Sequence, residues 1–247
     1  MPKEQQAEKR KPHSAVAKNS MLHYLEDLFE GSVLFGEGAP LDARLTRGDP
    51  HSKVLLLTGS NASGKSFAIR VLAAWLNDSK PRVEPLQISM KYRTMQGMHR
   101  IFMYGALQDD TNSTGSVSMV ALEGGIRTAK ERETPCWLML DEPDTGLSED
   151  FGYAMGQYIA EYANSGLGPK CRGLVVVTHS RELVKGLRET LKQEPHFAHV
   201  GTPTLSLQEW LEGAHRRSMS ELLGLSKKSV ETYRKVQKVL NDRGAGD

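Results

Sequence analysis

GSNASGKS, residues 59–66, matches the loop pattern G-x-x-x-x-G-K-[ST]. The apolar run Val54–Leu57 precedes it and a helix-compatible stretch, 67–76, follows, so the sequence predicts a strand, a tight loop and a helix in that order. Glycines let such a loop curl until successive backbone N–H groups point at phosphate oxygens. A glycine-rich turn without a ligand is the alternative, and the strand–loop–helix context argues against it. The sequence therefore predicts a site for a nucleoside triphosphate.

Side chains and backbone have separate expected roles in this loop. Lys65 is expected to reach the β- and γ-phosphates of ATP, and the Ser66 hydroxyl to bind Mg²⁺. The residues expected to surround the nucleotide are Gly59, Ser60, Asn61, Ala62, Ser63, Gly64, Lys65, Ser66 and Phe67.

A second motif, WLMLDEP at residues 137–143, is an apolar run that ends in two acidic residues. We expect Asp141 to hold Mg²⁺ through water and Glu142 to polarise the attacking water or accept its proton. An isolated Asp–Glu pair at a strand end is common. This pair follows both a glycine-rich loop and an apolar run, which favours the catalytic interpretation.

A third motif, LVVVTHS at residues 174–180, places His179 at the end of a buried strand. There it is expected to hydrogen-bond the γ-phosphate or the attacking water. A histidine at a strand end is usually structural, but here it is the third element in a consistent order. Loop, acidic strand and Thr–His strand follow one another as in ABC-type ATPases.

Continuous apolar runs separated by helical segments predict an α/β fold with a mainly parallel central sheet flanked by helices, of the ABC-type P-loop NTPase class. A helix-turn-helix-like appendage is expected at the C-terminus. The expected strands are 53–58, 136–140 and 173–178, and the expected helices are 20–29, 65–77, 119–131, 149–164, 218–223 and 226–240.

The region between the loop and the acidic strand resembles a known family. ABC-type enzymes hydrolyse ATP between two heads, and a serine at a helix start of one head completes the site of the other. The transporter form of that segment, LSGGQ, is absent, and STGSVSMVAL stands at residues 113–122. With this segment the chain resembles the ATPase domain of the MutS family of DNA mismatch-repair proteins. The similar positions include Arg100, Phe102, Asp109, Asp110, Ser113, Ser116, Met119, Gly146, Ser148, Gly152, Ala160, Glu161, Thr178, His179, Glu212, Gly213, Ser218 and Leu223–Leu225.

This resemblance implies a head-to-tail homodimer, or a pair with a related head, in which Ser116 acts in trans. It also implies a DNA transaction such as repair, recombination or mobile-element and defence biology. Ser60 and Pro143 depart from the family pattern. Fewer than 60 residues precede the loop, so we expect a stand-alone head without the mismatch-binding, connector, lever and clamp domains, working with a partner protein.

Three weaker assignments also follow from the resemblance. Gln108 lies in the region that senses Mg²⁺ and water in ABC heads. Phe35 is expected either to pack in the core or to stack on adenine, and core packing is favoured. The segment 144–150 is expected to communicate between the two sites of the dimer.

Charge and composition give a coarse division of the chain. Residues 1–20 form a basic tail that we expect to be disordered, 21–214 an ATPase domain, and 215–247 a C-terminal helical segment for dimerisation or interaction. The basic residues of that last segment predict either a solvated helix face or contact with DNA. The net charge of +2 implies no partner by itself.

The expected compartment is the cytoplasm. The two cysteines, Cys136 and Cys171, adjoin apolar runs and predict buried reduced thiols. No apolar run approaches the roughly 20 residues that span a bilayer, so no membrane partner is expected. Two other functions share the motifs: a regulatory ATP switch that controls a partner enzyme, and an ABC transporter subunit, which the absence of LSGGQ disfavours.

Overall fold

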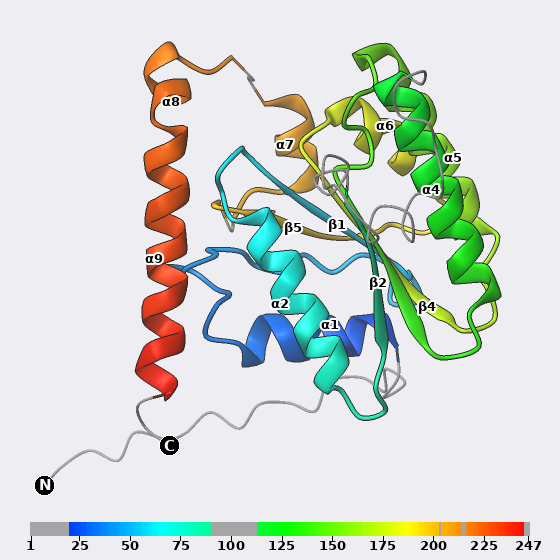
Figure 1. Cartoon of the computed structure of the whole chain (residues 1–247), viewed down its shortest axis with the longest axis horizontal. Helices are drawn as coiled ribbons and strands as arrows, with labels where there is room; N and C mark the ends of the chain where they lie inside the picture. Colours follow the sequence, from blue (N-terminus) through cyan, green and yellow to red (C-terminus); the bar gives the residue numbers. More distant parts are fainter. Residues whose placement is uncertain (1–19, 90–112, 203, 214–215, 245–247) are drawn as a thin grey trace, which may run out of the picture.

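The computed structural model describes residues 20–89, 113–202, 204–213 and 216–244. Within them, five parallel strands form one sheet in the order β2-β3-β4-β1-β5 (Figure 1). The strands are β1 Val54–Gly59, β2 Glu84–Ser89, β3 Cys136–Asp141, β4 Cys171–Thr178 and β5 His196–Val200. The helices are α1 Met21–Gly31, α2 Lys65–Asp78, α4 Thr114–Glu131, α5 Glu149–Asn164, α6 Arg181–Thr190, α7 Leu207–Glu212, α8 Met219–Leu223 and α9 Leu225–Gly244. The predicted α/β fold with a parallel sheet between helices is confirmed.

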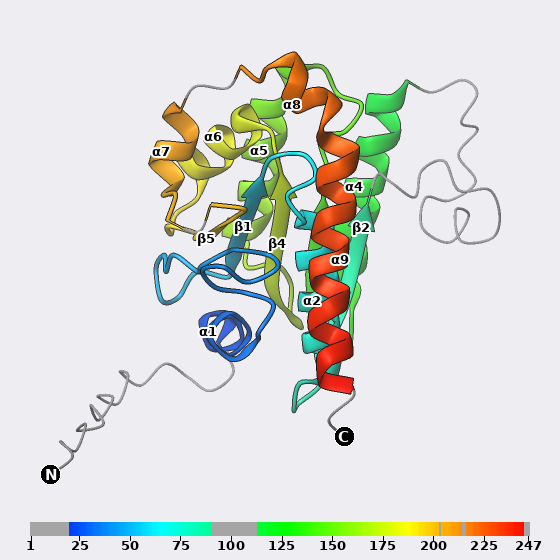
Figure 2. The ribbon, with the colours of Figure 1, turned by 90° about the vertical axis from the view of Figure 1, so that its left-hand side faces the viewer.

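Helices cover both faces of the sheet, which explains why its strands are apolar at consecutive positions. Side chains alternate along β1, so Leu55 and Leu57 pack with α1 and α2, while Leu56 packs with α4, α5 and α6. Figure 2 shows α1, α2 and α9 on one side of the sheet and α4 and α5 on the other. Two apolar cores therefore hold the strands rigidly between helical layers.

The position of β4 matters most for the site. It lies between β1 and β3. At the carboxyl end of the sheet, Thr178 of β4 pairs with Thr58 of β1, and Val177 of β4 pairs with Asp141 of β3. Because all three strands are parallel, their carboxyl ends meet at one edge of the sheet. The three motifs, far apart in the sequence, therefore end side by side.

The structure contains elements that the sequence patterns did not reveal. Strands β2 and β5 and helices α6 and α7 were not expected. Polar residues interrupt both strands: Glu84, Gln87 and Ser89 in β2, and His196 and His199 in β5. Helix α4 begins at Thr114 rather than 119, since Ser113 caps it with a hydrogen bond from the Ser116 backbone N–H.

The C-terminal helices are more continuous than a helix-turn-helix. Gly224, the single residue between α8 and α9, has near-helical dihedral angles (φ −77°, ψ −10°), and its carbonyl accepts from Lys228 N. Helix α9 then runs along α2, with Val236 only 1% exposed in the core on that side (Figure 1). The predicted boundary at 214/215 falls outside the described residues, and the division into segments stays a prediction.

The two cysteines lie in the core, as the sequence predicts. Cys136 and Cys171 are buried, unbridged and adjacent in the register of β3 and β4. Across the described helices, none combines the length and the apolar character that crossing a membrane requires.

Candidate functional site

The Gly59–Ser66 loop joins β1 to α2, as the sequence predicts. Gly64, just before α2, has φ +105°, a conformation that residues with a Cβ rarely adopt. A Cβ there would lie 3.0 Å from Leu41 Cδ2 and 3.2 Å from Thr232 Cγ2. Glycine is therefore required both for the turn and for the close approach of α9.

Lys65 is directed across this loop. Its side chain is 5% exposed, and Nζ donates to the carbonyl oxygens of Gly59 (2.9 Å) and Ser60 (3.2 Å). Nζ also lies 3.7 Å from Glu142 Oε1. The ammonium group therefore sits between the loop backbone and the end of β3.

Glu142 connects the loop to the third motif. It follows β3 with φ +54°, and its backbone N–H donates to Val177 O on β4 (2.8 Å). Its Oε1 is 3.6 Å from His179 Nδ1. The Glu142 carboxylate raises the pKa of His179 above its ordinary value, with a smaller contribution from Asp144. The structure thus brings together Lys65, Glu142 and His179.

Asp141 lies beside them, 2% exposed, and its Oδ2 accepts from Ser89 Oγ (3.0 Å). The hydroxyl of Ser66, at the start of α2, is the second predicted metal ligand. Hydroxyl and carboxylate oxygens are the hard donors that Mg²⁺ prefers, and this ion usually keeps several waters. In the described part of the chain, no three or more His, Cys, Asp or Glu side chains gather as a metal cluster. The oxygen donors of Ser66 and Asp141 fit the ligand chemistry of Mg²⁺.

Three supporting contacts were missed by sequence reasoning. Ser89 could not be found because β2 itself was not expected. Asp144, named only as part of a communicating segment, accepts from Thr178 Oγ1 (3.1 Å) and ties the loop after β3 to β4. His199, on β5, lies 2.9 Å from Thr58 Oγ1. Burial, assisted by Lys65 and other nearby cations, lowers the pKa of His199 to about 4, so the side chain is neutral at pH 7.

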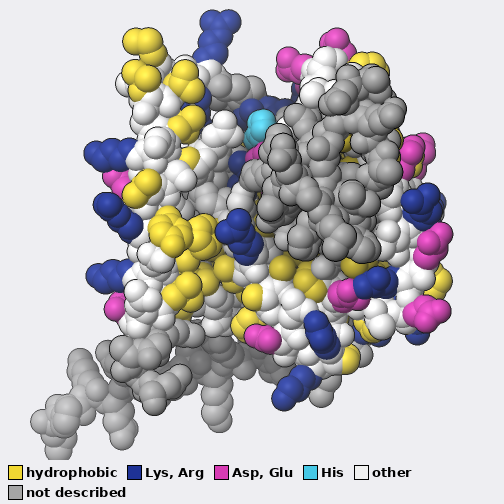
Figure 3. All heavy atoms as spheres, viewed as in Figure 1, with side chains coloured by type: hydrophobic (Ala, Val, Ile, Leu, Met, Phe, Trp, Pro, Cys, Tyr) yellow, Lys and Arg dark blue, Asp and Glu magenta, His cyan; other side chains and the backbone are white. Residues whose placement is uncertain are grey.

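Helix α9 covers one side of the loop. A cavity of about 540 Å³ is lined by residues 61–67, by Glu142 and by four residues of α9: Ser229, Val230, Thr232 and Tyr233. Figure 3 shows hydrophobic side chains gathered between α9 and α2. The segment that the sequence assigned to dimerisation thus forms a wall of the cavity in its own chain.

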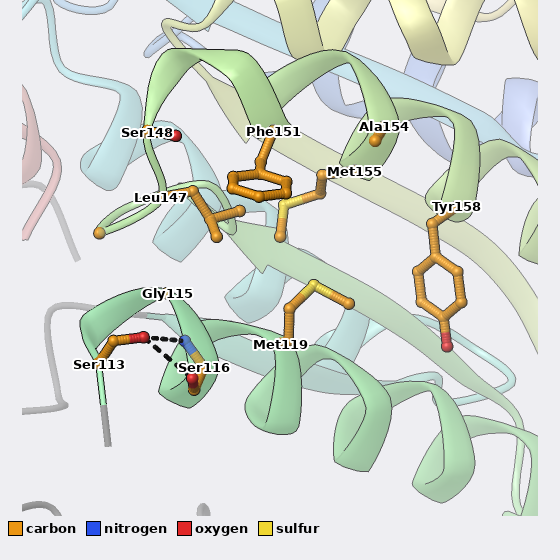
Figure 4. Close-up of a pocket in the computed structure, with 11 residues that line it drawn as sticks. Ser113, Gly115, Ser116, Met119, Leu147, Ser148, Phe151, Ala154, Met155 and Tyr158 are labelled. Carbon is orange, nitrogen blue, oxygen red and sulfur yellow. Dashed lines mark hydrogen bonds between the residues drawn. The ribbon is translucent and has the colours of Figure 1, made fainter. Parts of the chain in front are cut away.

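Ser116 lies elsewhere. It sits in the first turn of α4, where its Oγ is 2.9 Å from Ser113 Oγ. A separate pocket of about 530 Å³ opens there between α4 and α5, with Phe151 and Met155 pointing toward Met119 (Figure 4). Ser116 is not among the residues that line the Lys65 cavity. Its predicted role in trans stays a prediction.

Phe35 packs in the core, which is the favoured one of its two predicted roles. It is 6% exposed, and its ring centroid lies 4.5 Å from that of Phe29. Several predicted positions lie outside the described residues: the tail 1–19, Arg100, Phe102, Gln108, Asp109 and Asp110.

Comparison with known proteins gives distant structural similarities. No family model and no curated protein matches the chain. Among solved structures, Cdc6p from Pyrobaculum aerophilum aligns with 73% of this chain and 44% of its own length, at 16% identity and a TM-score of 0.32. The Orc1 protein of Aeropyrum pernix, in complex with DNA, gives the same coverage and TM-score at 21% identity. The chain spans less than half of either protein, and at these values neither similarity bears on its function.

Proposed function

We propose that this chain binds ATP with Mg²⁺ and hydrolyses it to ADP and phosphate. The observation that carries the proposal is the position of the Glu142 carboxylate at the end of β3, 3.7 Å from Lys65 Nζ of the glycine-rich loop and 3.6 Å from His179 Nδ1. A nucleophile-activating carboxylate, a fixed cation and a histidine at one sheet edge are the groups that phosphoryl transfer to water needs.

The residues divide the chemistry among them. The loop amides and Lys65 hold the β- and γ-phosphates and stabilise the charge that develops on them. Glu142 accepts a proton from water as the water oxygen bonds to the γ-phosphorus and the bond to the β–γ bridging oxygen breaks. His179, whose raised pKa favours its protonated form, donates to a γ-phosphate oxygen. Ser66 and Asp141 would hold Mg²⁺, which when bound neutralises negative charge on the phosphate oxygens.

The test is nucleotide turnover matched with nucleotide binding. The wild-type chain is expected to release phosphate from ATP in the presence of Mg²⁺, and chelation of the metal should stop the reaction. Lys65→Ala should abolish binding as measured by titration calorimetry. Failure of the wild-type chain to bind ATP under any of these conditions would overturn the proposal.

The proposed working form is a head-to-tail dimer in which Ser116 reaches the γ-phosphate of the partner. Ser116 is exposed, and the Ser113 side chain caps the start of its helix. The exposed start of α4 can therefore approach another molecule, and the positive end of the helix dipole favours a phosphate there. The resemblance to MutS-type heads favours this pairing.

We further propose a role in DNA transactions together with a partner protein. The support is the resemblance and a set of exposed basic residues on α9: Lys227, Lys228, Arg234, Lys235 and Lys238. Light scattering coupled to size exclusion, applied to Glu142→Gln with and without ATP-Mg²⁺ and a short duplex, tests both ideas. An ATP-dependent dimer that retains DNA supports them. An ATP-dependent dimer that does not bind the duplex would contradict direct DNA contact.

A further inference from the structure

Helix α9 is anchored beside the loop by apolar contacts that do not involve a ligand. Val236 is 1% exposed, and Val239 packs against the same core as α2. The Thr232 methyl lies close enough to Gly64 that a Cβ at Gly64 would be 3.2 Å from it. The face of α9 that carries Thr232 and Tyr233 is therefore held at a defined distance from the loop.

An aromatic pair stands where α9 meets α2. The rings of Phe67 and Tyr233 have centroids 5.8 Å apart at an interplanar angle of 48°. Gln237 Nε2 donates to Tyr233 Oη (2.6 Å), which orients the phenol, and the Arg70 guanidinium lies 6.0 Å from the Phe67 ring centroid. Tyr233 is nevertheless 46% exposed. An oriented ring with an exposed surface can accept a planar ligand.

This pair lines the same cavity as Lys65 and Glu142. Its volume, about 540 Å³, lies within the range of small-molecule sites. Because Lys65 and Glu142 belong with the terminal phosphate, the base and ribose need another part of the cavity. Among the described residues that line it, Phe67 and Tyr233 are the aromatic ones. Phe35, the sequence-based candidate for stacking, is buried in the core instead.

We propose that the nucleobase stacks on the exposed ring of Tyr233, with Phe67 behind it, so that α9 forms one wall of the nucleotide site. The proposal rests on the proposed function of the Lys65 site. Stacking on an aromatic ring is tolerant of base identity, since every base has a π-face. Tyr233 is therefore a residue that contributes to nucleotide affinity.

The test distinguishes the contribution of the nucleobase to binding from that of the phosphates. Titration calorimetry compares ATP with inorganic tripolyphosphate, each with Mg²⁺, on the wild-type chain and on Tyr233→Ala, Tyr233→Phe and Tyr158→Ala. Tyr158 is a partly exposed tyrosine on α5, away from this cavity, and serves as the control. Circular dichroism verifies that each variant folds. We expect the Tyr233 variants to fold, because Val236 still anchors α9 in the core.

We expect Tyr233→Ala to bind ATP roughly 10- to 100-fold more weakly and tripolyphosphate as well as the wild type does. Tyr233→Phe and Tyr158→Ala should bind both as the wild type does. Equal weakening of ATP and tripolyphosphate binding in Tyr233→Ala would show that Tyr233 only supports the loop. Unchanged ATP binding in Tyr233→Ala would place the base elsewhere. Either result overturns this inference and leaves the proposed function standing. A wild-type chain that binds neither ligand would overturn the proposed function, and this inference with it.

Discussion

The Glu142 carboxylate lies 3.7 Å from the Lys65 ammonium, and both side chains are largely buried, at 18% and 5% exposure. The pair joins the glycine-rich loop to the end of β3. Because Glu142 Oε1 also lies 3.6 Å from His179 Nδ1, one carboxylate lies beside both the ammonium group and the imidazole of the site. Its replacement is therefore the most direct way to separate binding from chemistry.

Glu142→Gln keeps the size of the side chain and removes its ability to accept a proton. We expect kcat for ATP hydrolysis to fall by about 10²- to 10⁴-fold, while ATP still binds. Phosphate release and titration calorimetry on the same preparation measure the two quantities. Lys65→Ala is the comparison variant and should lose binding itself.

The same pair of variants tests the regulatory alternative. A nucleotide switch would retain its effect on a partner after Glu142→Gln and lose it after Lys65→Ala. Unchanged hydrolysis in Glu142→Gln would remove this residue from the catalytic role.

Ser116→Ala should leave binding intact and abolish turnover, because Ser116 is absent from the lining of the Lys65 cavity and is proposed to act on the partner. A mixture with Glu142→Gln gives the sharper result. In a head-to-tail dimer, each mixed pair contains one site with an intact Glu142 and an intact Ser116. Random pairing of equal amounts should restore about one quarter of the wild-type activity.

Activity of the mixture is compared with that of each variant alone at the same total concentration. Absence of any restoration, with mixed dimers verified by mass, would contradict a composite site. Full activity of Ser116→Ala alone would remove Ser116 from the mechanism.

The buried His199 should make stability depend on pH. Its pKa is about 4 in the folded chain against 6.5 for an ordinary histidine, so the unfolded chain binds more protons between these values. The free energy of unfolding should therefore fall as pH decreases from about 6.5 to about 4, by about 3 kcal/mol from this residue.

Urea unfolding at a series of pH values measures the effect. Between pH 6.5 and 4, the free energy of unfolding should fall less in His199→Gln than in the wild type. The control is His51→Gln, at an exposed turn, which should lose as much as the wild type does. If the unfolding free energy of His199→Gln depends on pH as that of the wild type does, His199 is not the cause of the pH dependence.

Helices α5 and α6 touch through glycine, and this contact predicts a large packing effect. A Cβ at Gly156 would lie 2.0 Å from Leu183 O, so Gly156→Ala must separate the two helices. We expect a loss of about 1–3 kcal/mol or more in the free energy of unfolding. A Cβ added at Gly124, on α4, would meet no neighbouring group within 4 Å, and Gly124→Ala should stabilise the chain by about 0.5–1 kcal/mol. Denaturant titration of both variants measures the difference, and destabilisation by both would contradict the packing explanation.

Sequence patterns predicted much of the fold for identifiable reasons. The strands β1, β3 and β4 are continuous apolar runs, because both of their faces are buried, and α5 was predicted with its observed bounds, Glu149–Asn164. Strand β2 escaped detection because its polar positions lie at the sheet edge. With β2 unrecognised, the hydrogen bond from Ser89 to Asp141 could not be anticipated.

The sequence alone determined which chemical groups end β1, β3 and β4, since loop composition and apolar runs are local properties of the chain. Only the tertiary structure decided how these groups meet. Insertion of β4 between β1 and β3 places His179 beside Glu142, and the packing of Val236 brings Tyr233 over the loop. Strand order and helix docking depend on which distant apolar surfaces fit together. Such fitting leaves no periodic signal in either segment by itself.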